Sequence, residues 1–173
     1  MKKLSILVVL VLCLALLAAC SDNTSGENKP AGKVTYGDGF VFTYKNVNMS
    51  PDAPAKEVID AIPEKYEYFE AASCAFEGLD KTYTYPHIEV DTYPGDVDRI
   101  VAIYLRDDLV STPEGLKIGD SKEAMERIYG TGYTVNGIEY TYAKGSMSLK
   151  LHVEDGKVTY ICYASKVLGQ VAE

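Results

Sequence analysis

Residues 120–130, with the sequence DSKEAMERIYG, decide how the folded part of this chain is built. Asp120 is a suitable helix cap, and Glu123, three residues later, can reach back to complete a capping box. Gly130 suits the end of such a helix, because glycine readily adopts the left-handed conformation found there. The stretch therefore predicts a short helix between two clear boundaries.

A second helix with the same pattern is expected 66 residues earlier, where Lys56-Glu57 matches Lys122-Glu123. Pro54 suits its first turn and Pro63 ends it. Each helix carries apolar residues at spacing i, i+1 and i+4, as expected for one buried face. These residues are Val58, Ile59 and Ile62 in the first helix, and Ala124, Met125 and Ile128 in the second.

The segments after the two helices also correspond in order. Residues 147–153 alternate between apolar and polar side chains, which indicates a half-buried strand. We therefore expect an α+β fold of two tandem repeats, each a helix followed by an antiparallel meander of three strands, with one further strand near 40–44. The matching segments are Tyr83-Thr84-Tyr85 with Tyr140-Thr141-Tyr142, Ile88-Glu89-Val90 with Leu149-Lys150-Leu151, and Arg99-Ile100 with Lys157-Val158.

The repeats are expected to span residues 36–108 and 109–173, with 36–166 forming one compact domain. Residues 1–19 begin with Lys2 and Lys3 and continue as an apolar run that is too short to span a bilayer. This pattern predicts a lipoprotein signal peptide, the alternatives being an uncleaved anchor helix or an ordinary secretory signal. Residues 20–35 are polar and predict a flexible tether.

The residues LAAC at positions 17–20 resemble the lipobox of bacterial lipoproteins. The resemblance implies cleavage before Cys20 and attachment of a diacylglycerol or acyl lipid, such as palmitate, to its thiol. The protein would then lie on the extracytoplasmic face of the cell membrane, or on the outer membrane if the source is Gram-negative. This lipid is the only cofactor expected.

The duplicated helix-plus-meander pattern resembles the tandem-repeat fold of the beta-lactamase inhibitor protein. Residues 114–123, EGLKIGDSKE, and the following Tyr129-Gly130 carry this likeness, which also extends to the small lipoprotein of the outer-membrane barrel assembly machine. Residues 73–81, SCAFEGLDK, resemble uncharacterised lipoproteins of Gram-positive, clostridial-type gut bacteria. Neither resemblance implies an activity or transfers contact residues.

Composition and motifs argue against several functional classes. The formal charge of −8 and the pI near 4.8 argue against a nucleic-acid partner, whose phosphates require a basic surface. The mature chain has no Gly-x-Ser-x-Gly or Ser-x-x-Lys motif, and only His87 and His152 are available as histidine ligands. We therefore expect neither an enzyme nor a metal site, although Asp91, Asp96 and Asp98 cluster near one turn as candidate calcium ligands.

Cys74 and Cys162 remain after the signal peptide and the lipid account for the other two cysteines. Because exported proteins meet an oxidising environment, these two residues are candidates for a disulfide between the repeats; two separate buried thiols are the alternative.

The paired tyrosines predict a recognition surface. Tyr83, Tyr85, Tyr140 and Tyr142 are expected on strands of which one face is free of helices, and tyrosine is common in binding surfaces. We expect a non-catalytic module that binds an envelope protein or peptide. The alternatives are a small-molecule or calcium-binding lipoprotein, a weak hydrolase that uses a cleft between the repeats, and a purely structural envelope component.

Overall fold

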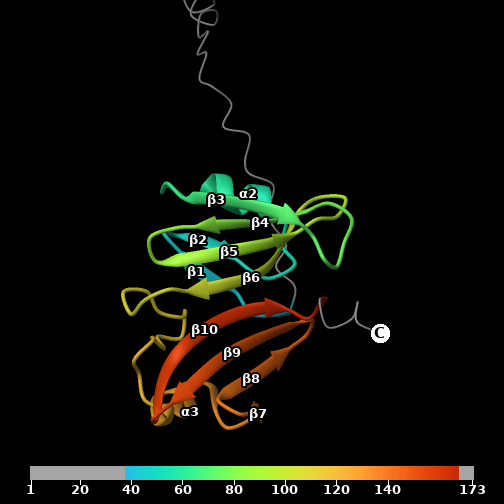
Figure 1. The fold of residues 1–173 in the computed structure, drawn as a ribbon. Coiled ribbons are helices and arrows are strands. Elements are labelled where there is room, and N and C mark those ends of the chain that lie inside the picture. The colour runs from blue at the N-terminus through green and yellow to red at the C-terminus, as the bar shows by residue number, and fades with distance from the viewer. Residues whose placement is uncertain (1–37, 168–173) are drawn as a thin grey trace, which may run out of the picture. The chain divides into compact units, whose positions relative to one another are not determined.

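The main feature of the fold is one antiparallel sheet of eight strands, seen in a computed structural model that describes residues 38–167 (Figure 1). The strands lie in the order β3-β4-β5-β6-β10-β9-β8-β7. The described residues belong to one compact unit that extends from Ala31 to Glu173. The elements are β1 (Phe42–Tyr44), β2 (Val47–Met49), α2 (Ala55–Ala61), β3 (Glu67–Ala72), β4 (Leu79–Thr84), β5 (Ile88–Tyr93), β6 (Arg99–Leu105), α3 (Lys122–Tyr129), β7 (Thr134–Asn136), β8 (Glu139–Lys144), β9 (Met147–Glu154) and β10 (Lys157–Ser165).

Along the chain, a helix and four strands are followed by a second helix and four strands. The prediction of mixed, antiparallel structure is confirmed, but strand accounts for much more of the fold than helix. Each helix is followed by four strands rather than the three expected, because β3 and β7 were not predicted. The strand expected near 40–44 pairs only with β2, in a separate two-stranded sheet.

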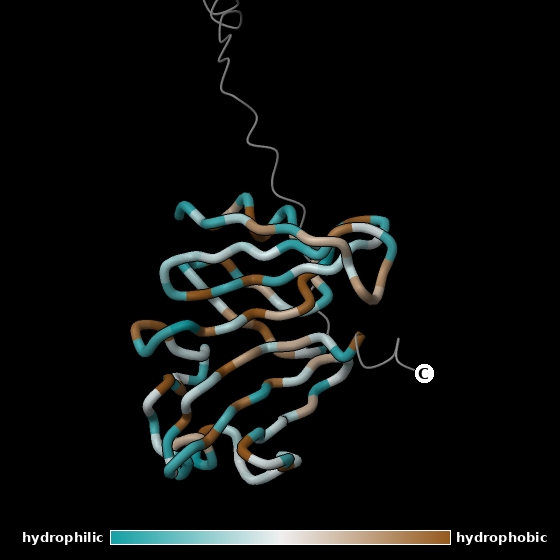
Figure 2. The backbone as a smooth tube through the Cα atoms, in the orientation of Figure 1, coloured by the Kyte–Doolittle hydropathy of each residue, from teal (hydrophilic) through white to brown (hydrophobic). Residues whose placement is uncertain are grey.

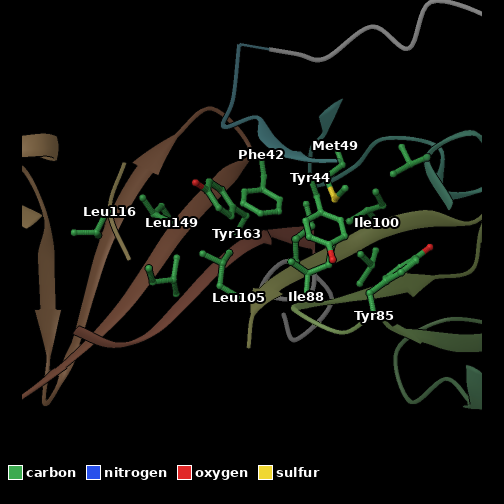
Figure 3. Packing of buried hydrophobic residues seen from close by; sticks show 14 of the residues in the cluster. Phe42, Tyr44, Met49, Tyr85, Ile88, Ile100, Leu105, Leu116, Leu149 and Tyr163 are labelled. Carbon is green, nitrogen blue, oxygen red and sulfur yellow. The ribbon is translucent and has the colours of Figure 1, made fainter. Parts of the chain in front are cut away.

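The core lies between one face of the eight-stranded sheet and the elements packed against it. These elements are the β1–β2 hairpin, α2 and α3, which contribute Phe42, Val58 and Met125. The sheet contributes alternate residues of each strand because successive side chains point to opposite faces. Apolar and polar segments alternate along several strands in Figure 2, and Figure 3 shows Phe42 beside Tyr163 of β10, with ring centroids 5.5 Å apart.

Both predicted helices are present, and their ends show which boundary signals were correct. The residue before α3 is Ser121, whose hydroxyl accepts a hydrogen bond from the Ala124 amide. The prediction that Asp120 caps this helix is wrong: its carboxylate accepts from the Lys117 amide and stabilises the preceding turn. Because the cap lies one residue later, Glu123 is not in the capping-box position. Gly130 ends the helix at φ 77°, as predicted.

Candidate binding groove on the open face of the sheet

A groove of about 640 Å³ crosses the face of the sheet that the helices leave open. Six strands contribute to it, from β4 through the central β6 and β10 to β8. In β10, Ile161 and Tyr163 are buried in the core, whereas Cys162 and Ala164 between and beside them line the groove. In this part of β10, the alternation of side chains between the two faces therefore separates the core from the groove.

Two β-bulges shape the strands beneath the groove. Asp91 is opposite Ala102 and Thr92 is opposite Ile100, so Val101 is an extra residue in β6. In β10, Thr159 is extra in the same way, between Val158 and Tyr160. A bulge places consecutive residues on one face and increases the local twist, and Val101 and Ala102 accordingly both line the groove.

Asp91 is the most distinctive polar group on the first-half side of the groove. Its carboxylate accepts a hydrogen bond of 2.7 Å from the Thr82 hydroxyl. Burial raises the pKa of Asp91, and the hydrogen bonds from Thr82 and Tyr104 only partly oppose this effect. Burial also raises the pKa of the Tyr104 phenol. Asp91 thus presents a partly desolvated acceptor, suited to an amide or ammonium donor of a ligand.

On the second-half side, the groove is lined by the Tyr160 ring and by the charged side chains of Glu139 and Lys150. The imidazole of His152 stacks on the ring of Tyr160, with centroids 4.3 Å apart. Glu139 lies 3.7 Å from the Lys150 amine and 3.7 Å from the His152 imidazole. The ring centroids of Tyr160 and Tyr104 lie 6.1 Å apart at the centre of the groove. The groove therefore combines flat aromatic surface with charges of both signs, which suits a mixed polar and apolar ligand such as a peptide.

Cys162 lies at the centre of this surface. Burial raises the pKa of its thiol to about 11, so the thiol is protonated at neutral pH. A protonated, buried thiol is a poor nucleophile, because the thiolate is the reactive form. Cys162 therefore contributes a small apolar surface to the groove.

The four tyrosines predicted to form a recognition surface lie on the covered face of the sheet. Tyr85 and Tyr142 retain only 1% and 7% of their exposure and belong to the core, so neither can contact a partner. Tyr83 and Tyr140 are half-buried against the same core. The prediction that these residues line the open face is wrong. Thr82 and Thr141, which directly precede Tyr83 and Tyr142, line the groove instead.

Cys74 and Cys162 are both free thiols. Cys74 is exposed in the loop between β3 and β4, and Cys162 is buried in β10. From β4 to β10 there are three strand spacings, about 14 Å in all, whereas a disulfide requires Cα atoms within about 7 Å. The predicted disulfide does not form, and of the two thiols only Cys162 is buried.

The candidate calcium ligands do not converge. Asp91 lines the groove, Asp98 forms an ion pair of 2.6 Å with Lys81, and Asp96 is exposed. Within residues 38–167, no three His, Cys, Asp or Glu side chains are placed to hold a metal ion. His87 is not among the residues that line the groove, and its Nδ1 lies 2.6 Å from the Asp107 carboxylate.

The predicted signal peptide, the lipid-bearing Cys20 and the tether to residue 35 lie outside the described residues. Among the residues that the structure does describe, no helix has the length and apolar character needed to cross a membrane.

Sequence reasoning missed most of the groove. Tyr104, Lys150 and Tyr160 were not predicted as site residues, although Tyr104 and Lys150 each lie between apolar neighbours in their strands. That alternation was a usable signal, but it required knowing which six strands are neighbours. No family model, curated protein or solved structure matches this chain, so its function is argued from its own residues.

Proposed function

We propose that this protein is an extracytoplasmic lipoprotein, anchored to the membrane through Cys20, that binds a protein or peptide of the cell envelope without catalysing a reaction. The observation that carries the binding role is the groove of about 640 Å³ on the open sheet face. Its lining includes Asp91 and Tyr104 from the first half and Lys150 and Tyr160 from the second. A ligand in the groove would therefore contact both halves of the protein.

We also propose that the two halves are tandem helix-plus-meander repeats, as the likeness to the beta-lactamase inhibitor protein implies. Equivalent backbone contacts at the two helix starts support this proposal. Pro54 bridges to Arg99 and Ser121 bridges to Lys157, in each case linking the residue before a helix to the first residue of its last strand. These pairs place the helices 67 positions apart rather than 66, because α3 begins one residue later than the Lys-Glu match indicated.

The hydrogen bonds around these bridges also correspond. Ala55 donates to the Asp98 carbonyl at 2.9 Å, and Lys122 donates to the Gly156 carbonyl at 2.9 Å. The extra bulge residues Val101 and Thr159 are separated by the same 58 positions as the bridge residues Arg99 and Lys157. A bulge is a specific structural feature, so its recurrence supports duplication more strongly than a shared count of strands.

The lipid anchor has a direct test in cells grown with radioactive palmitate. The native chain should incorporate label and sediment with membranes, whereas Cys20→Ser should incorporate none and keep its signal peptide. Mass spectrometry of the purified native protein should find Cys20 as the modified first residue. An unmodified first residue beyond position 20 would overturn the anchor.

The binding role is tested by a photo-crosslinking amino acid placed in the groove at Thr141, with Glu57 on the exposed side of α2 as the matched control position. In intact cells, irradiation should give a discrete higher-mass product from position 141 and none from position 57. Equal labelling at both positions, or no product at 141, would reject the groove as the binding surface.

A small-molecule ligand is the second candidate, because the groove volume falls within the roughly 300–1,000 Å³ typical of such sites. A thermal-shift screen of metabolites would support it if one compound raised the melting temperature of the native protein and had no effect on Lys150→Ala.

A further inference from the structure

Two clusters of three tyrosines lie at corresponding positions on the covered face of the sheet. In the first half, the Tyr66 ring lies 5.2 Å from Tyr83 and 5.4 Å from Tyr85. In the second half, the ring of Tyr133, 67 positions after Tyr66, lies 4.9 Å from Tyr140 and 5.6 Å from Tyr142. All four contacts have T-shaped geometry.

The cluster in the second half has its own polar partners. The Lys122 amine lies 5.4 Å from the centroid of the Tyr140 ring, which is the geometry of a cation–π contact. Glu126 pairs with Lys122 at 3.2 Å and accepts a 2.6 Å hydrogen bond from the Tyr133 hydroxyl. Helix α3 therefore supplies both a cation and a carboxylate to this cluster.

The cluster in the first half lacks these partners. The residues 67 positions before Lys122 and Glu126 are Ala55 and Ile59, which are buried in the core. No cation lies over the Tyr83 ring among residues 38–167, where the three cation–ring contacts involve Tyr44, Phe40 and Tyr140. Lys56 pairs with Asp60 at 2.5 Å and Lys81 with Asp98 at 2.6 Å. Lys65, which directly precedes Tyr66, makes no cation–ring contact among these residues.

Strand β3 makes the first-half cluster accessible. It is an edge strand of six residues, all of them exposed, whereas β7 at the other edge has three. Tyr68 on β3 is 48% exposed, and its ring lies 5.3 Å from Tyr83. Tyr66, just before the strand, is 44% exposed. An edge strand has unpaired backbone groups along one side, so an extended segment can add to it as a further strand.

The charge of the two halves indicates what kind of segment would bind there. Residues 38–108 contain 15 acidic and 6 basic side chains, a net charge of −9, whereas residues 109–167 contain 7 of each. Glu67 and Glu70 lie on β3 itself, and Glu70 accepts a hydrogen bond from the Tyr68 hydroxyl. An acidic surface attracts a basic segment and repels another acidic one, including a second copy of this half.

We propose that Tyr66, Tyr68 and Tyr83, together with the open edge of β3, bind an extended basic segment of a partner protein. One lysine or arginine of the partner would lie over the Tyr83 ring, as Lys122 lies over Tyr140. The partner backbone would pair with β3 as a ninth strand. This surface is on the covered side and edge of the first half, separate from the groove.

The test uses the full chain in non-ionic detergent and a fluorescent heptapeptide of alternating lysine and valine. Fluorescence anisotropy should show binding that weakens as salt increases, and no binding when glutamate replaces lysine. Tyr83→Leu should weaken binding by about threefold to thirtyfold, the range expected for loss of a cation–π contact. Tyr68→Ala should also weaken binding, because it removes the exposed ring that packs 5.3 Å from Tyr83. Methylation of alternate backbone nitrogens of the peptide should also weaken binding, because it removes donors needed for strand pairing.

Val135→Ala is the matched control, because Val135 is opposite Tyr140 on the edge strand β7 just as Tyr68 is opposite Tyr83. Its exposure, 52%, is close to that of Tyr68. If Tyr68→Ala proves unstable, Tyr68→Leu is used in its place. It retains apolar area but lacks the aromatic ring, so it should still lose affinity. Equal losses for Val135→Ala, binding of the glutamate peptide, or no binding of the lysine peptide at millimolar concentration would overturn the proposal. Self-association that Tyr68→Ala abolishes would instead identify a second copy as the occupant.

Discussion

Tyr104 of β6 and Cys162 of β10 lie directly opposite each other at the boundary between the two halves of the sheet. On either side of them, Leu105 pairs with Ile161 and Ile103 pairs with Tyr163. A shift of 58 positions relates Ile103 to Ile161 and Leu105 to Tyr163, so it converts each flanking pair into the other. The same shift relates Tyr104 to its own partner, Cys162. The Tyr104–Cys162 pair is therefore the point about which the strand register is symmetric, and it lies in the centre of the groove.

Replacing the tyrosines at two equivalent positions should change stability in opposite directions. The Tyr142 hydroxyl donates a 2.6 Å hydrogen bond to the Gly130 carbonyl, whereas the Tyr85 hydroxyl is buried without a hydrogen-bond partner among the described residues. In urea unfolding, Tyr142→Phe should reduce the free energy of unfolding by about 1 kcal/mol. Tyr85→Phe should leave it unchanged or increase it, because an unsatisfied polar group is removed. A larger loss from Tyr85→Phe would contradict this assignment.

The cap of α3 should depend on Ser121. Ser121→Ala removes the acceptor for the Ala124 amide and should reduce the free energy of unfolding by about 1 kcal/mol. The informative comparison is Ser121→Asp, in which an acceptor is retained and most of the stability should return. Thermal or urea unfolding measures both variants. A fully stable Ser121→Ala protein would show that the cap is energetically unimportant.

The two thiols should react at very different rates. A chain that starts at Ser21 contains only Cys74 and Cys162. Because Cys74 is exposed and Cys162 is buried with a pKa of about 11, one thiol should react rapidly with Ellman's reagent in the folded protein. The second should react only after unfolding in guanidinium. Detection of no thiol under either condition would reveal the disulfide that the structure excludes.

Asp91 should make stability fall as pH rises. Because burial raises the pKa of Asp91 in the folded protein, the folded state holds a proton that the unfolded state has already released. Stability therefore decreases as pH rises from the ordinary carboxyl range, near 4, through the raised pKa. Asp91→Asn lacks this titration and retains an acceptor for the Thr82 hydroxyl.

The measurement is the difference in the free energy of unfolding between Asp91→Asn and the native protein, from pH 3 to pH 8. Subtraction removes the effect of the carboxylates with lowered pKa values, such as Asp107, which are common to both proteins. The advantage of Asp91→Asn should grow with pH and then level off. A difference that shrinks with rising pH would mean that the Asp91 carboxylate is stabilised in its charged form.

Local signals in the sequence were sufficient for many elements of the fold. Both helices, the end of α3 at Gly130 and the alternation along β9 followed from residue spacing and from turn chemistry. Where local signals were ambiguous, the predictions failed. Asp120 and Ser121 are both good caps, and the choice of Ser121 is seen only in the structure, where its hydroxyl accepts from the Ala124 amide and its backbone bridges to Lys157. Strand β3 was missed because all its residues are exposed and show no alternation.

The sequence by itself determined the alternation of apolar and polar residues, the turns and the positions of both helices, because these depend on neighbours within a few positions. Only the tertiary structure decided which face of each strand became groove and which became core. That choice depends on strand order, which brings β6 beside β10 although more than fifty residues separate them. Pairing at such a distance places Asp91, Tyr104, Tyr160 and Lys150 on one surface, and no local pattern specifies it.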